Sequence, residues 1–80
     1  MWRDLARGIA LDYLAALRAR DHARARAEFA TQMAEAARIM AARVTVGSAP
    51  EADLLRLRTE ETRAALERTR ADLAAARALD

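Results

Sequence analysis

The feature that most constrains this chain is a short break between two long helical patterns, residues 44–51 (Val-Thr-Val-Gly-Ser-Ala-Pro-Glu). Gly47 can take the left-handed conformation that ends a helix, because it has no Cβ to clash there. Ser48 and Glu51 have the spacing of a capping box, in which the hydroxyl accepts from the Glu51 amide and the carboxylate accepts from the Ser48 amide. Pro50 is tolerated in a first helical turn, where its missing N–H would have no partner. The break therefore predicts that one helix ends near residue 44 and that a second begins at about residue 49.

The segments on both sides of the break have the composition of helices. The 80 residues include only two glycines and one proline, and 54% are hydrophobic although only 4% are aromatic, so alanine carries much of the apolar content. A tight turn between two long helices folds them back on each other. We predict an all-α protein in which two long antiparallel helices form a coiled-coil α-hairpin with a tight tip at residues 45–50. The single hairpin spans 1–80, with helix one over about 2–44, the tip over 45–48 and helix two over about 49–79.

The second helical segment carries a coiled-coil repeat. Leucine, threonine and alanine recur at alternating spacings of four and three residues, which is the spacing of core positions in a coiled coil. We predict that this line is the helix–helix seam. It consists of Leu55, Thr59, Thr62, Leu66, Thr69, Leu73 and Ala76. A second line, of small residues with one leucine, indicates a further neighbour and contains Leu57, Ala64, Ala71, Ala75 and Ala78.

The first helical segment carries two stripes as well, which indicates a helix packed on more than one side. One stripe contains Phe29, Met33, Ala36 and Met40. The other, on which alanine allows the close approach of another backbone, contains Ala23, Ala27, Ala30, Ala34, Ala37, Ala41 and Val44.

Residues 1–17 are the most apolar part of the chain, and they extend beyond the expected end of helix two. If the hairpin turns near Gly47, Asp80 lies opposite roughly residue 15. An overhanging apolar helix requires cover from another copy, another protein or a continuation of the chain. Residues 76–80 contain no helix stop signal, so we interpret the hairpin as a fragment of a larger protein.

The sequence offers little for catalysis or ligand binding. There is no cysteine, and His22 is the only histidine. A general base or a metal ligand needs converging partners, whereas the adjacent Asp21 points elsewhere on a helix. A glycine-rich phosphate loop and a nucleophile elbow are both lacking in the sequence. We therefore expect no enzyme activity, no catalytic residue, no cofactor and no metal site.

Charge and hydropathy limit the partners. Fourteen basic residues oppose twelve acids, so the net charge is only +2 and no strongly basic face is indicated. The basic segment Arg18, Arg20, Arg24 and Arg26 is interrupted by Asp21 and has no aromatic residue within it to stack bases. No run approaches the roughly 18 apolar residues of a transmembrane helix. We expect no nucleic-acid partner and no membrane span in this segment.

The run of residues 43–57 (Arg-Val-Thr-Val-Gly-Ser-Ala-Pro-Glu-Ala-Asp-Leu-Leu-Arg-Leu) resembles the periplasmic hairpin of TolC-type outer-membrane efflux proteins, particularly the heavy-metal efflux branch. Residues 10–17 are also similar to that family's first hairpin helix. The resemblance implies a structural segment of the periplasmic helical tunnel of a trimeric outer-membrane protein, which meets the membrane only through other parts of the parent. It further implies that Val46, Gly47 and Ser48 dock a periplasmic adaptor protein in a tripartite efflux system. Family tips often carry Val-Gly-Leu, and Ser48 stands here in place of the leucine.

Two other functions stay open at the level of the sequence. The first is a stand-alone helical module for oligomerisation or protein interaction, in which hairpins bury their overhangs together, so that the isolated chain self-associates. The second is a small basic regulator that binds nucleic acid with strong salt dependence.

Overall fold

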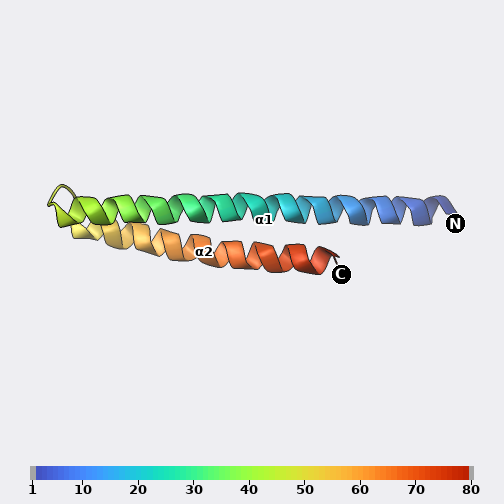
Figure 1. Ribbon diagram of the computed structural model, residues 1–80. Coiled ribbons are helices and arrows are strands. Elements are labelled where there is room, and N and C mark those ends of the chain that lie inside the picture. Colours follow the sequence, from blue (N-terminus) through green and yellow to red (C-terminus); the bar gives the residue numbers. More distant parts are fainter. Residues whose placement is uncertain (1, 80) are drawn as a thin grey trace.

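The protein is an antiparallel pair of long helices, as predicted. The computed structural model describes residues 2–79, in which α1 spans Trp2–Thr45 and α2 spans Glu51–Leu79. The helices lie side by side in a rod of 68 × 13 × 13 Å, with the turn at one end and both termini towards the other (Figure 1). The all-α hairpin is thereby confirmed. Neither helix, over the described residues, has a stretch long and apolar enough to cross a membrane.

α1 ends in a Schellman motif built on Gly47. Gly47 has φ 78°, the left-handed region that favours glycine. The Ser48 amide donates to the Arg43 carbonyl at 2.9 Å, and the Gly47 amide donates to the Val44 carbonyl at 3.0 Å. These two bonds satisfy carbonyls that the last turn of a helix would otherwise leave without partners. The predicted role of Gly47 in the turn is therefore confirmed.

The predicted capping box is wrong. The Ser48 hydroxyl donates to the Arg43 carbonyl at 3.2 Å, so Ser48 belongs to the end of α1 and not to the start of α2. Residues 46–50 lie outside both helices. α2 begins at Glu51, two residues after the predicted start at about residue 49. Pro50 directly precedes it, and its carbonyl accepts from the Asp53 amide at 3.1 Å. Glu51 and Asp53 lie in the first turn of α2, where the positive end of the helix dipole stabilises negatively charged side chains.

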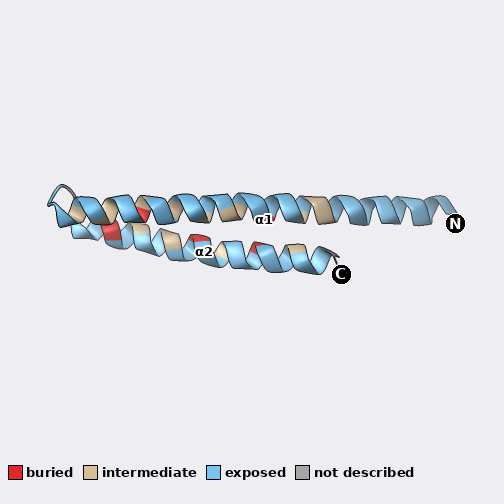
Figure 2. Cartoon of the chain, viewed as in Figure 1, coloured by how far each residue is buried: buried red, intermediate tan, exposed pale blue. Residues whose placement is uncertain are grey.

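The core is a line of small residues between the two helices, which we call the alanine seam. Among residues 2–78, the buried positions are Ala23, Ala37, Leu54, Ala64 and Ala71, and Figure 2 shows buried positions where the helices face each other. On α1, the positions that alternate by three and four residues from Ala16 to Val44 are all buried or half-buried. They are Ala16, Ala19, Ala23, Arg26, Ala30, Met33, Ala37, Met40 and Val44. The line that packs on α2 thus takes Ala23, Ala30, Ala37 and Val44 from the predicted alanine stripe and Met33 and Met40 from the other stripe. Ala34 and Phe29 are exposed.

The predicted helix–helix seam of α2 is also wrong for the contact within the hairpin. All seven of its residues are exposed: Leu55, Thr59, Thr62, Leu66, Thr69, Leu73 and Ala76. Most of the line of small residues that was expected to meet a further neighbour packs on α1 instead: Ala64 and Ala71 are buried, Leu57 and Ala75 are half-buried, and Ala78 is exposed. Two small-residue faces let the helix backbones approach closely, which leaves the leucines and threonines on the opposite side of α2. We call this exposed line the Leu/Thr stripe.

The amino-terminal part of α1 has no cover. Residues 2–15, which we call the overhang, are exposed throughout, and half-burial begins at Ala16 (Figure 2). The expected overhang is therefore present. It leaves several large apolar side chains in contact with solvent, among them Trp2, Leu5, Ile9, Leu11, Tyr13 and Leu14.

Candidate interaction surfaces

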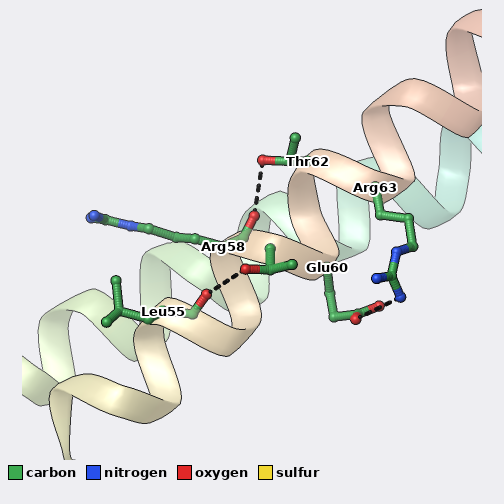
Figure 3. Close-up of polar contacts among 6 residues, drawn as sticks. Leu55, Arg58, Glu60, Thr62 and Arg63 are labelled. Carbon is green, nitrogen blue, oxygen red and sulfur yellow. Dashed lines mark hydrogen bonds and ion pairs between the residues drawn. The ribbon is translucent and has the colours of Figure 1, made fainter.

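The Leu/Thr stripe is more apolar than its composition suggests. The hydroxyls of Thr59, Thr62 and Thr69 donate to backbone carbonyls one turn earlier, at 3.0, 3.0 and 3.1 Å (Figure 3 shows the bond from Thr62 to Arg58). Their donors are therefore already satisfied within the helix. A neighbouring helix can cover this stripe without leaving a hydroxyl hydrogen unpaired, which would otherwise cost about 1–3 kcal/mol for each buried donor.

A row of arginines borders the Leu/Thr stripe at every seventh residue and consists of Arg56, Arg63, Arg70 and Arg77. Arg63 pairs with Glu60 at 3.2 Å and Arg70 pairs with Glu67 at 3.4 Å (Figure 3 shows the first pair). Both pairs are exposed and contribute little to stability. The row gives one edge of the stripe a positive charge.

An acidic row runs along α1 with the same period. Asp21, Glu28 and Glu35 stand seven residues apart. Each lies two residues from seam positions on both sides, which places it on the opposite side of α1, away from α2. Arg38 donates to the Glu35 carboxylate from Nε at 3.0 Å, and a second bond from Nη2 makes the pair bidentate. These hydrogen bonds, together with the positive charge of Arg38, lower the pKa of the Glu35 carboxyl below its ordinary value. The acidic row of α1 and the arginine row of α2 thus have opposite charge, although Arg18, Arg24 and Arg38 lie beside the acidic row.

The tip presents its side chains to solvent. Val46 is 77% exposed, and Gly47 and Ser48 are exposed beside it. The predicted docking residues are therefore accessible together at one end of the rod. The turn residues Pro50 and Glu51 lie next to them and are exposed as well. Docking of an adaptor protein through this tip stays a prediction.

Open depressions flank the alanine seam, and two of them show which residues of the two helices lie beside each other. One, of about 300 Å³, is lined by Ala30, Thr31, Ala34, Glu61, Ala65 and Arg68. Another, of about 230 Å³, is lined by Ala34, Ala37, Arg38, Ala41, Arg58 and Glu61. Apart from Thr31, their walls are alanine methyl groups and charged side chains. Both helices line each depression, so residues 30–34 of α1 lie beside residues 61–68 of α2, and residues 34–41 lie beside residues 58–61.

His22 is exposed on α1 and lies outside the alanine seam. Among residues 2–79, no three or more histidine and acidic side chains come together as a group that could hold a metal ion. The exposed features of the hairpin are the Leu/Thr stripe, the two charged rows, the overhang and the tip.

The two charged rows were not predicted from the sequence. Their signal was present, because four arginines and three acids each repeat every seven residues. A count of net charge hides this period of seven.

Fold and surfaces together define an antiparallel helical hairpin with exposed apolar side chains on the outer side of α2 and on the overhang. Comparison with protein-family models, with curated proteins and with solved structures found no match to this chain.

Proposed function

We propose that the hairpin is a structural segment of the periplasmic helical tunnel of a TolC-type outer-membrane efflux component, and that its tip docks a periplasmic adaptor protein in a tripartite efflux system. The sequence of residues 43–57 suggests the family. The structural observation that carries the proposal is the Leu/Thr stripe, which lies on the side of α2 opposite the alanine seam. A helix in the wall of a tunnel contacts neighbours on two sides, and α2 has an apolar line on each of two sides.

The charged rows support a wall made of hairpins placed side by side. In such a wall, α2 of one hairpin adjoins the outer side of α1 of the next, so the arginine row meets the acidic row. Ala30 and Arg68 line the same depression between the antiparallel helices. Glu28 comes two residues before Ala30 and Arg70 two residues after Arg68, so Glu28 and Arg70 lie at about the same height along the rod. The same step of seven brings Arg63 level with Glu35 and Arg77 level with Asp21.

The arginine row also disfavours a simpler arrangement. Two α2 helices that paired through their Leu/Thr stripes in antiparallel orientation would bring the arginine rows of both copies to the same edge. Like charges along the edge of a helix pair are destabilising. The stripe therefore fits a helix other than a second α2.

The location and the role in efflux are tested in cells that carry the gene for this hairpin. The proposal expects the gene product in the periplasm and outer membrane after fractionation. It also expects that disruption of the gene sensitises the cells to exported toxic compounds, heavy-metal ions included. A cytoplasmic gene product would overturn the proposal.

The tip is tested by complementation of the disrupted gene with Val46→Glu. Val46 is 77% exposed, so the substitution leaves the hairpin intact while it changes the docking surface. We expect protein abundance and oligomeric state to stay normal and export to fall. Ala74→Glu, an exposed change away from the tip, is the matched control and should retain export. Full export by the Val46 variant would rule out a docking role for this side chain.

A further inference from the structure

Two methionines lie in the alanine seam, between the helices. Met33 and Met40 are half-buried positions of α1 that stand seven residues apart, so they lie in successive layers on the side that packs on α2. Residues 30–41 of α1 lie beside residues 58–68 of α2, as the depressions along the seam show. Both methionines are therefore well inside the paired part of the hairpin, and their cover comes from the middle of α2.

The contact between the helices depends strongly on these two side chains. The buried residues are four alanines and one leucine. An alanine buries a single methyl group, whereas a methionine fills irregular space between helices and removes much more apolar surface from water. Among the seam positions of α1, which run from Ala16 to Val44, Met33 and Met40 are the apolar side chains larger than valine. A chemical change at both therefore alters a large share of the contact.

The same two side chains are the readily oxidised groups of the seam. The sequence has no cysteine, so thioethers are its sulfur groups. Because Met33 and Met40 are half-buried, part of each side chain meets solvent, and an oxidant as small as hydrogen peroxide reaches it. The sulfur lone pair attacks one peroxide oxygen, the O–O bond breaks, and the products are methionine sulfoxide and water. The thioether loses two electrons, and the peroxide gains them.

We propose that Met33 and Met40 are a paired modification site at which peroxide loosens the hairpin. Oxidation converts a flexible apolar side chain into a polar one that needs hydrogen bonds. A sulfoxide that stays covered in the seam gives up hydrogen bonds to water, and one that turns out to solvent withdraws its side chain from the seam. Either result weakens the contact between the helices, and it does so in two successive layers.

The modification is reversible. Methionine sulfoxide reductases remove the oxygen with a dithiol as the reductant, so that the thioether is restored, the oxygen leaves as water and the dithiol becomes a disulfide. The inference concerns the inside of the hairpin and does not rest on the proposed role in efflux.

The experiment compares thermal unfolding of the purified 80-residue chain before and after treatment with hydrogen peroxide, by far-ultraviolet circular dichroism. Trypsin cleaves after arginine, so Met33 and Met40 fall in separate peptides, 27–38 and 39–43, and mass spectrometry counts the oxygen added to each. We expect the midpoint to fall by about 5–10 °C once both carry oxygen. It should recover after treatment with reductases for both sulfoxide epimers and dithiothreitol.

Matched variants assign the effect to the seam. Met33→Leu combined with Met40→Leu keeps the seam apolar at similar volume and removes both sulfurs, so the midpoint should no longer respond to peroxide. Met1, which lies outside the described residues, stays in this variant as a site of oxidation. Ile39→Met in the same double variant is the control, because Ile39 is next to Met40 in sequence but is 44% exposed and off the seam. Its oxidation should leave the midpoint unchanged.

Three results would overturn the inference. The first is an unchanged midpoint when both tryptic peptides carry oxygen. The second is an equal fall in the double leucine variant, which would assign the effect to Met1 or Trp2. The third is that both peptides stay unoxidised under conditions that oxidise Met1 completely, which would mean that the seam shields both sulfurs. Met33→Gln combined with Met40→Gln gives an independent check: a polar amide replaces each thioether, and the midpoint should fall without peroxide.

Discussion

Leu54 and Leu55 are neighbours in sequence, but Leu54 is 7% exposed and Leu55 is 58% exposed, because their side chains project from different sides of α2. Leu54 packs into the alanine seam near the tip, and Leu55 begins the Leu/Thr stripe. The pair separates the two uses of this helix: one side holds the hairpin together, and the other is left for a neighbour.

Replacement of these two leucines should therefore have unequal effects on stability. Leu54→Ala removes a buried side chain and should lower the free energy of unfolding by about 2–3 kcal/mol. Leu55→Ala, at an exposed position with the same gain in helix propensity, should change it by less than about 0.5 kcal/mol. Urea unfolding followed by far-ultraviolet circular dichroism measures both. Equal losses would mean that Leu55 is also buried in the folded chain in solution.

A larger side chain in the alanine seam should lower the stability of the hairpin about as much as a truncated one does. Ala64 is 3% exposed, and Ala64→Leu should cost about 1–3 kcal/mol because the larger side chain forces the helices apart. Ala74→Leu, on the exposed side of α2, is the control and should be nearly neutral. Thermal unfolding of both variants checks this. An unchanged midpoint for Ala64→Leu would show that the helices do not approach closely at this level.

The two glycines should respond in opposite directions to alanine. Gly47 has φ 78°, so Gly47→Ala strains the turn and should destabilise the hairpin by about 1–2 kcal/mol. Gly8 is inside α1, and a Cβ there meets nothing within 4 Å, so Gly8→Ala should stabilise the helix by about 0.5–1 kcal/mol. Chemical denaturation distinguishes the two signs. Stabilisation by Gly47→Ala would mean that the chain turns without the Schellman motif.

The bond between Glu35 and Arg38 should be visible in the titration of Glu35. Because Arg38 lowers the pKa of the Glu35 carboxyl, Arg38→Gln should raise that pKa towards its ordinary value. The folded chain binds the proton of this group less tightly than the unfolded chain does. The pair therefore favours the folded state above the unfolded pKa, and this contribution is lost as the pH falls through the lowered pKa. Carboxyl-carbon NMR measures the titration, and an unchanged pKa in the variant would show that the pair does not form in solution.

Much of the fold followed from local chemistry. Gly47 fixed the position of the turn, and the scarcity of other breaks predicted two long helices and a hairpin. The sides of α2 could not be assigned in the same way, because a second line repeats with the same spacings of three and four residues as the Leu/Thr stripe: Leu54, Leu57, Glu61, Ala64, Arg68 and Ala71. Period alone does not tell which line meets the partner within the chain.

The error had a specific physical cause. The seam of α2 was predicted from its repeat alone, although the alanines of α1 already indicated close approach between the backbones. Two alanine-rich faces match each other, and Leu66 and Leu73 are then left outside. The capping box was wrong for a related reason, because a serine at position 48 can cap the start of α2 or bond to the end of α1. In the structure its amide and its hydroxyl both donate to the Arg43 carbonyl of α1.

The Schellman motif at Gly47 also has a consequence for the order in which the chain folds. Every contact between the helices joins residues whose separation along the chain grows steadily with distance from the turn. The entropy lost on loop closure is thus smallest beside Gly47, and each layer formed shortens the loop that the next layer must close. We therefore expect the helix pair to form first beside the turn and to extend towards the far end, and to open from the far end first. Amide protons near Val44 and Leu54 should be the last to exchange with solvent, and those near Ala19 and Ala75 the first along the seam.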